Sequence, residues 1–289
     1  MTWDPSALDR RRFLRAGAAA GLGLAARTAL AAADQPEDPF GGFKLGAQSY
    51  TFREFNTEQT LQRLKELGLH YVEFYQKHAP PESSPEQIRA LLKLCREYGV
   101  TPRAWGVQRF TRNDAANRKT FEFGKALGLK MFSADPDPDS FDSLDKLCAE
   151  YQIAIGIHPH GPQGGNRLHR WYSAEVILKA VKDHHPLIGS CLDTGHLIRA
   201  AQLGKKLDPA AEVRAMGRRN FGIHLKDHDN QKQTDVVFGK GALDLAGVLR
   251  ALRDVKFDGL LSIEYEAHPK QPLPDVRECV AIFRQAVKG

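Results

Sequence analysis

The sequence predicts a single (β/α)8 TIM barrel, in which eight parallel strands alternate with helices. Residues 44–288 repeat one unit, which consists of an amphipathic helix, a glycine or short polar break, and four to six mostly apolar residues. Eight such units suit the length of about 250 residues that is typical of this barrel. No glycine-rich dinucleotide fingerprint follows the first strand, which disfavours an open doubly wound sheet.

The apolar runs give the expected strands in chain order. Helices of 10–16 residues separate them, and alternation of this kind favours parallel strands joined by right-handed crossovers. The predicted strands are residues 44–50, 70–75, 101–107, 129–134, 153–158, 187–193, 220–225 and 259–265.

The predicted helices carry start and stop signals. Gly68, Gly99 and Gly128 follow helical segments at positions that suit a left-handed C-terminal cap. In "SSPEQ", Ser84 is the expected N-cap, with proline in the first turn and Gln87 three residues further on. These signals support the helix boundaries implied by the strands.

Residues 1–33 are predicted to form a twin-arginine (Tat) export signal. "DRRRFLRAG" contains the Arg-Arg-x-Phe-Leu order, and an Ala/Gly/Leu stretch leads to small-residue cleavage sites that end at Ala33. The apolar part, residues 16–30, is shorter than the roughly 20 residues that span a bilayer. A basic N-terminus without a targeting role and an uncleaved anchor are the alternatives. We therefore expect an exported, periplasmic protein whose barrel domain spans residues 34–289.

Charge and cysteine content restrict the classes of partner. The whole chain has a formal net charge of +6, and the five arginines and two aspartates of the leader leave +3 for the barrel. This is too small to imply a nucleic-acid partner, or a membrane partner after cleavage. The four cysteines lack the close paired spacing of a zinc site, and no required disulfide is expected. A homo-oligomer is compatible with the sequence.

Polar residues gather at the predicted carboxyl ends of the strands, where such barrels have their active sites. Seven of the 11 histidines lie at or just beyond these ends. Strands five to eight offer His158 or His160, Asp193, His224 and Glu264 at similar depth. Imidazole nitrogen together with carboxylate oxygen suits Mn, Co, Zn or Fe(II) better than calcium, with Mg a less suitable ion. The pattern predicts a divalent metal site at this rim.

Several of these residues also have a purely structural interpretation. Asp193 begins "DTGH" and could simply cap the next helix. His224 could be a core histidine bonded to backbone, and His158 and His160 could order their loop. The joint pattern favours the metal site more strongly than any single residue does.

Four further residues are candidates for substrate contact or catalysis. Glu73 either contacts substrate or forms hydrogen bonds inside the barrel. Lys226 points at substrate or at solvent. Glu264 and Glu266 share a strand face. Glu264 lies closer to the apolar run "LLSI" and is therefore the expected metal ligand, whereas Glu266 is the expected substrate contact. Trp105 either stacks on a sugar ring or packs in the core.

At these positions the chain resembles the xylose isomerase-like superfamily of sugar phosphate isomerases and epimerases, which are TIM barrels. The resemblance covers essentially all of residues 34–289 and rests on "LGAQSYTFRE", "YVEFY", "LDTGH", "HLKD", "GKGALDL" and "GLLSIEYE". It implies a metal site of Asp193, His224 and Glu264, with His196 near the substrate.

The end of the fifth strand departs from the family pattern. Isomerases and epimerases of this family usually have a glutamate there, which serves as ligand and base, whereas this sequence has "GIHPHGP". Residues two apart in a strand share a face, so either His158 or His160 is the expected ligand. The His-x-His pattern is similar to that of inosose dehydratases.

The resemblance implies a metal-dependent isomerase or epimerase that acts through an enediolate on an unphosphorylated sugar or keto-sugar. Glu264 is the expected base, and His196, Lys226 and His160 are the other candidate catalytic residues. No dedicated phosphate-cradling loop is present.

Three alternatives remain open at this point. A lyase or dehydratase would use the same enolisation for β-elimination on a keto-sugar, 3-keto-glycoside or inosose. A non-catalytic sugar-binding barrel would fit the missing glutamate. A nuclease would need a more basic surface than a net charge of +3 provides.

Overall fold

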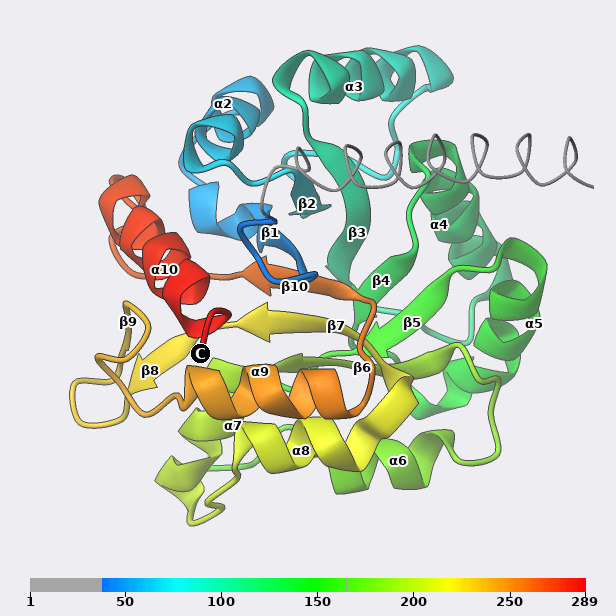
Figure 1. Cartoon of the computed structure of the whole chain (residues 1–289). Helices are drawn as coiled ribbons and strands as arrows, with labels where there is room; N and C mark the ends of the chain where they lie inside the picture. The colour runs from blue at the N-terminus through cyan, green and yellow to red at the C-terminus, as the bar shows by residue number, and fades with distance from the viewer. Residues whose placement is uncertain (1–37, 165) are drawn as a thin grey trace, which may run out of the picture. The chain divides into compact units, whose positions relative to one another are not determined.

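Eight parallel strands close into a barrel in the computed structural model, which describes residues 38–164 and 166–289 (Figure 1). The barrel order follows the chain, because each strand pairs with its predecessor and β10 closes on β1. The barrel strands are β1 (Lys44–Gln48), β2 (Tyr71–Phe74), β3 (Thr101–Gln108), β4 (Met131–Ala134), β5 (Ala154–Ile157), β6 (Ile188–Asp193), β7 (Asn220–Leu225) and β10 (Leu260–Ile263). The predicted (β/α)8 fold is therefore confirmed, and each predicted strand end lies within two residues of the observed one.

Helices surround the barrel and cover its outer face (Figure 1). They are α2 (Thr57–Leu67), α3 (Pro85–Tyr98), α4 (Asp114–Leu127), α5 (Phe141–Tyr151), α6 (Ala174–Val181), α7 (Thr194–Arg199), α8 (Pro209–Met216), α9 (Leu245–Asp254) and α10 (Leu273–Ala286). The predicted caps form. Gly68, Gly99 and Gly128 have φ of 70°, 68° and 73°, in the left-handed region that suits glycine. Ser84 and Gln87 exchange the two hydrogen bonds of a capping box.

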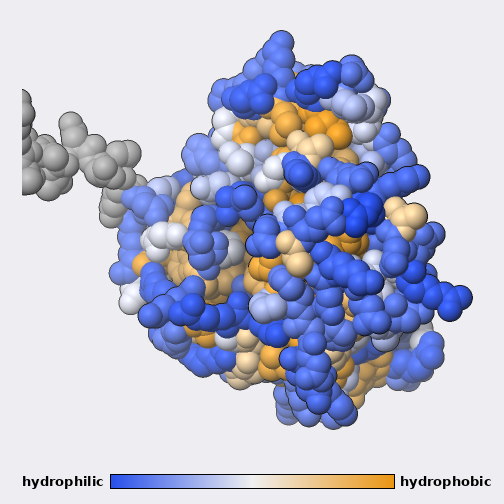
Figure 2. Space-filling view, turned by 90° about the vertical axis from the view of Figure 1, so that its right-hand side faces the viewer, coloured by the Kyte–Doolittle hydropathy of each residue, from blue (hydrophilic) through white to orange (hydrophobic). Residues whose placement is uncertain are grey.

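The core lies between the strands and the helix ring. Its best example is a cluster of aromatic rings under α4, where Phe110, Phe121 and Phe132 lie with ring centroids 5.3–5.8 Å apart. All three are fully buried, and each buried side chain of this size contributes on the order of 1.5–3 kcal/mol. Figure 2 shows the face of the barrel at which β7 and β10 begin, which is the right-hand side of Figure 1. Hydrophilic residues cover most of this face.

One element lies outside the predicted pattern. Directly after β7, strands β8 (Asp227–Asp229) and β9 (Thr234–Val236) form a two-stranded antiparallel sheet. Each strand has only three residues, too short for alternation of apolar and polar residues to identify it. Asp227 supports the hairpin, because its carboxylate accepts hydrogen bonds from the backbone of Gly239, Gly241 and Leu243. This sheet borders the carboxyl ends of the strands.

Two features of the chain bear on export and on membrane insertion. The predicted export signal, residues 1–33, lies outside the described residues and remains a prediction. Among the residues that the structure describes, no helix is both long enough and apolar enough to cross a bilayer.

The four cysteine thiols are buried and unpaired, and we expect them to be unreactive in the folded protein. Burial raises the pKa of Cys95, Cys148 and Cys279 to about 12 and that of Cys191 to about 11. The thiolate is the nucleophile, so at pH 8 alkylation by iodoacetamide should be negligible before unfolding and complete in guanidinium. Rapid labelling of any of the four in the native protein, read by mass spectrometry, would contradict this expectation.

Candidate active site

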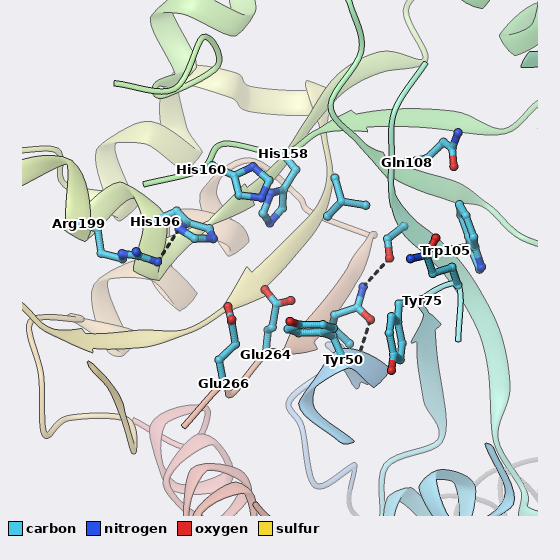
Figure 3. Close-up of a pocket in the computed structure, with 14 residues that line it drawn as sticks. Tyr50, Tyr75, Trp105, Gln108, His158, His160, His196, Arg199, Glu264 and Glu266 are labelled. Atoms are coloured by element: carbon cyan, nitrogen blue, oxygen red, sulfur yellow. Dashed lines mark hydrogen bonds between the residues drawn. The ribbon is translucent and has the colours of Figure 1, made fainter. Parts of the chain in front are cut away.

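A pocket of about 370 Å³ opens at the carboxyl ends of the strands. Its size lies within the range of about 300–1,000 Å³ that is usual for small-molecule sites. Figure 3 shows histidines and Arg199 along one side, Tyr75, Trp105 and Gln108 along the other, and Glu264 and Glu266 between them. The pocket therefore lies where the sequence pattern placed the site.

Four buried side chains from consecutive strands bring their ligand atoms together beside this pocket. His158 follows β5, Asp193 ends β6, His224 lies in β7 and Glu264 follows β10. Asp193 is level with His224 in the register of β6 and β7, which explains their matching depth. One nitrogen or oxygen from each of the four lies within 4.8 Å of the others. The structure thus assembles the predicted group of His158, Asp193, His224 and Glu264.

The spacing within this group fits a single divalent ion. His224 Nδ1 lies 2.9 Å from His158 Nε2 and 3.1 Å from Glu264 Oε2. Asp193 Oδ2 lies 3.5 Å from His158 Nε2 and 3.8 Å from His224 Nδ1. Ligands about 2.1 Å from one ion are separated by roughly 3.0–3.4 Å at tetrahedral or octahedral angles, so small shifts would complete the site.

The chemistry of the four atoms supports the same interpretation. Asp193 Oδ2 is buried and has no hydrogen-bond partner among the described residues. The Lys226 ammonium, 3.3 Å away, balances part of its charge without a hydrogen bond, and a divalent cation would supply the bond that Oδ2 lacks, an absence that costs about 1–3 kcal/mol. Two imidazole nitrogens and two carboxylate oxygens form a mixed set that suits Mn, Co, Zn or Fe(II).

Asp193 caps α7 and also belongs to the group of four. Its Oδ1 accepts a hydrogen bond of 2.7 Å from the backbone N–H of His196 and so caps α7. Its Oδ2 joins the group of four. Burial acts to raise the pKa of Asp193, but Lys226 and the neighbouring histidines lower it well below its ordinary value. The carboxylate is therefore ionised.

Glu73 lies beneath the group rather than in the pocket, which corrects the expectation that it contacts substrate. It is fully buried, and its Oε2 accepts hydrogen bonds from His224 Nε2 at 2.9 Å and from Ser262 Oγ at 2.8 Å. Ser133 donates to its other oxygen. Because His224 uses Nε2 for this bond, its Nδ1 faces the group of four. The carboxylate orients the imidazole, an arrangement typical of metal-binding histidines.

Lys226 places a buried ammonium among three carboxylates. Its Nζ lies 3.0 Å from Glu264 Oε2 and 3.3 Å from Asp193 Oδ2, and it also pairs with Glu266. Burial alone would lower the pKa of Lys226, but these acids raise it well above its ordinary value. Gly195 makes room for the lysine, since a Cβ there would lie 2.6 Å from Lys226 Cγ. Lys226 is 1% exposed, so it does not point at solvent.

Glu264 reaches both the group and the pocket. Oε2 makes all of its side-chain hydrogen bonds and ion pairs among the described residues, so Oε1 is the oxygen left for the pocket, which Glu264 lines. Burial acts to raise the pKa of Glu264, but Lys226 and His224 lower it below its ordinary value. The carboxylate is ionised at neutral pH.

The two histidines of "GIHPHGP" have different positions. Both histidines line the pocket, but only His158 belongs to the group of four, through its Nε2. Their rings lie 4.7 Å apart. Burial lowers the pKa of both, that of His160 to about 3. Both imidazoles are therefore neutral near pH 7.

His196 presents a defined tautomer to the pocket that it lines. Its Nδ1 accepts a hydrogen bond of 2.9 Å from the backbone N–H of Gly161, and an Arg199 nitrogen lies 3.3 Å from the same atom. Burial, Lys226 and the other histidines lower its pKa well below the ordinary value. The neutral ring therefore carries its proton on Nε2.

The opposite wall of the pocket is aromatic and amide-rich. Trp105 borders the pocket but is 3% exposed, donates to the Ala79 carbonyl oxygen at 2.8 Å and packs its ring against Phe123. Packing is therefore its main role. Tyr50 is 37% exposed, and its ring lies 5.3 Å from that of Tyr75.

The sequence pattern did not single out several of the lining residues. They include Gln48, Tyr75, Gln76, Gly106, Val107, Gln108 and Arg199. Gln48 and Gln108 end β1 and β3, so a search for polar residues at every strand end could have found them. Arg199 ends α7, and no sequence signal marks it.

The fold and site can be compared with known proteins. A family model described as "Xylose isomerase-like TIM barrel" matches residues 61–286. Comparison with curated proteins gives no match. A protein of unknown role from Parabacteroides distasonis is 27% identical, with a TM-score of 0.65 over 84% of this chain and 98% of that one.

Two structural neighbours have named activities. A D-psicose 3-epimerase, solved in the presence of D-fructose, is 15% identical, with a TM-score of 0.66 over 86% of this chain and 100% of its own. A "probable 3-DHS dehydratase" from Bacillus anthracis is 13% identical, with a TM-score of 0.63 over 83% of this chain and 99% of its own. At identities this low, the structural similarity shows a shared fold and nothing more specific.

Proposed function

Because this chain belongs to the xylose isomerase-like TIM barrel family, we propose that it is a divalent-metal-dependent sugar isomerase or epimerase. It acts through an enediolate on an unphosphorylated sugar or keto-sugar, and the predicted twin-arginine signal would direct this activity outside the cytoplasm. The observation that carries the proposal is the meeting of two imidazole nitrogens and two carboxylate oxygens within 4.8 Å, beside a pocket that Glu264 and His196 also line.

The group of four would hold the ion. When bound, a divalent cation would polarise the carbonyl oxygen of the sugar and stabilise the negative charge that develops there. His224 is held in position by Glu73, and Asp193 by its bond to the first turn of α7. The protein thus fixes its ligand atoms before substrate enters, which is the arrangement that electrostatic catalysis requires.

Glu264 is the proposed base that removes the proton next to the carbonyl. Its Oε1 is available to the pocket, and the carboxylate is ionised, so it can accept a proton. Lys226 holds the carboxylate in place and balances its charge. In isomerisation, the resulting enediolate is protonated at the former carbonyl carbon. In epimerisation, the carbon that lost its proton is protonated again, on its opposite face.

His196 is the proposed donor to an oxygen of the substrate. Its Nε2–H follows from the hydrogen bond that Gly161 donates to Nδ1. A neutral donor of this kind would bind a hydroxyl or enediolate oxygen without adding a full positive charge. His160, which also lines the pocket, would be the second imidazole that contacts substrate.

A β-eliminating lyase is the second candidate, and the end of β5 favours it. His158 stands there in place of a carboxylate, and it is neutral and committed to the group of four. Glu264 is then the carboxylate base that reaches the pocket from this group. One base is enough for elimination of a hydroxyl or alkoxide next to a ketone, and for isomerisation, whereas epimerisation needs a proton donor on each face.

The test is incubation of protein loaded with Mn²⁺, Co²⁺ or Zn²⁺ with aldoses, ketoses and 3-keto-glycosides in deuterated water. Enolisation predicts solvent deuterium on the carbon beside the carbonyl of at least one of them. An isomer of the same formula supports the first candidate, whereas an unsaturated ketone with new ultraviolet absorbance supports the lyase. Absence of deuterium from every sugar tested would refute both.

We expect His158→Ala to abolish tight metal binding, whereas His160→Ala retains it. The reason is that His158 Nε2 lies 2.9 Å from His224 Nδ1, while His160 lies outside the group of four. Elemental analysis after dialysis should find on the order of one ion per chain in the wild type and in His160→Ala. The reverse result would assign the ligand to His160. No stoichiometric metal in the wild type would favour a non-catalytic sugar-binding barrel.

A further inference from the structure

A second, smaller cavity adjoins the pocket. We name it the annex; it has a volume of about 200 Å³. Arg199 and Glu266 line both the annex and the main pocket, so the two spaces meet at these side chains. The annex has room for on the order of six waters at about 30 Å³ each, and thus for a group larger than a single hydroxyl.

The β8–β9 hairpin builds the outer wall of the annex. His228 comes from β8, Thr234 and Asp235 come from β9, and Gln233 lies in the turn between them. Asp235 Oδ2 accepts a hydrogen bond of 3.2 Å from the backbone N–H of Glu266. The hairpin is thereby tied to the same segment that supplies Glu264 and Glu266 to the pocket.

His228 leaves a buried polar atom unused at the annex. The residue is 3% exposed, and its Nδ1 lies 2.9 Å from Asp235 Oδ1, which fixes the ring. Its Nε2 is buried and has no hydrogen-bond partner in the described part of the chain. Such an atom costs about 1–3 kcal/mol; because it is buried, a small shift of the ring would be needed before a ligand in the annex could bind it and gain this free energy.

Arg199 is the second underused group. No ion pair with a carboxylate involves its guanidinium among the described residues, and its Nε is buried without a hydrogen-bond partner. Gly161 covers that nitrogen, because a Cβ added to Gly161 would lie 3.0 Å from it. The guanidinium contacts His196 Nδ1 at 3.3 Å. Its remaining donors are therefore available at the point where pocket and annex meet.

The mixture of groups around the annex identifies the kind of ligand. Arginine donates only, the carboxylates of Asp235 and Glu266 accept only, and the amide of Gln233 does both. An anionic ligand would meet two carboxylates, and an apolar one would leave several polar groups unpaired. A hydroxyl both donates and accepts, so a ring that carries several hydroxyls satisfies such a wall.

We propose that the annex is a second sugar subsite, so that the substrate is a disaccharide or a glycoside with a hydroxyl-rich second ring. One ring lies at the metal group, and the other extends past Arg199 and Glu266 to His228 and Thr234. This inference rests on the proposed function for the placement of the first ring. In the lyase alternative, the annex would hold the leaving group.

The test compares binding of monosaccharides and disaccharides to metal-loaded protein by calorimetry. D-glucose and D-fructose are the single rings, and maltose, cellobiose, trehalose and sucrose are the double rings. At least one disaccharide is expected to bind about tenfold or more tighter than either monosaccharide. The proposal is overturned if none does.

Variants locate the effect in the annex. His228→Leu removes the unused nitrogen and is expected to erase the tenfold preference while leaving monosaccharide binding unchanged. Thr234→Val is a second, milder variant in case the first does not fold, and it should reduce the preference. His70→Leu is the matched control, because His70 is exposed and lies just before β2, far from His228 in the sequence. This variant should retain the preference for the disaccharide. Equal weakening of both sugar classes in His228→Leu would also refute the proposal.

Failure of the inference can be told from failure of the proposed function. Deuterium exchange into a monosaccharide without any disaccharide preference would leave the function intact and reject the annex as a subsite. A disaccharide preference that depends on His228, without deuterium exchange, would support the subsite and reject the enzymatic proposal.

Discussion

Replacement of Glu264 by Gln is expected to lower the rate of solvent deuterium exchange by about 10²–10⁴-fold, the range in which a positioned general base contributes. The amide is nearly isosteric but cannot accept the proton. It also removes one negative charge beside Lys226 and His224. The measurement is the initial rate of deuterium incorporation into the sugar that shows the fastest exchange with the wild type, monitored by mass spectrometry.

The control for this variant is Glu278→Gln. Glu278 on α10 makes an exposed ion pair with Lys240, and exposed pairs of this kind contribute little. Its exchange rate should equal that of the wild type. If Glu264→Gln retained most of the wild-type rate with its metal still bound, another group would have to be the base, and the proposed mechanism would be wrong.

The second large effect is expected for Glu73→Gln, which should weaken metal binding by about 10–100-fold. The glutamine keeps the size of the side chain but loses the negative charge on the oxygen that accepts a hydrogen bond from His224 Nε2. His224 is then less basic and less firmly oriented. Burial acts to raise the pKa of Glu73, and the contacts with His224, Ser133 and Ser262 lower it below its ordinary value, so the charge is present near neutral pH.

Competition with a chelator of known affinity measures this change. Glu66→Gln is the matched control, because Glu66 is exposed and, among the residues that the structure describes, forms its ion pair with Arg277 alone. Thermal unfolding of the metal-free variants shows whether the fold is retained. Unchanged metal affinity in a folded Glu73→Gln protein would mean that His224 does not depend on Glu73, and that the buried carboxylate serves the barrel interior alone.

The barrel itself could be predicted because its signals are local. Glycines at helix ends, the Ser84 capping box and the apolar runs each depend on a few neighbouring residues. Their alternation, repeated eight times, leaves few other folds open. The β8–β9 hairpin was missed because its strands have three residues each and are held by Asp227 through backbone bonds to a later loop.

The site was predicted in part. Asp193, His224 and Glu264 follow from the rule that the ends of parallel strands meet at one rim, since each lies at a strand end. The role of Glu73 was ambiguous. The alternation of residues in β2 predicts that its side chain points into the barrel, but it does not predict whether the pocket extends deep enough to reach that side chain. His158 and His160 share a strand face in sequence terms, but β5 ends at Ile157, and only His158 joins the group of four.

The sequence by itself determined the barrel, the strand ends and the kinds of ligand atom at the rim, because periodicity and caps act over a few residues. Only the tertiary structure decided that His158 joins the group of four, that Glu73 lies under His224, and that Arg199 borders a second cavity. These facts depend on distances between side chains from different strands and loops. Such distances are set by the closure of the barrel and by packing across it, which no local pattern encodes.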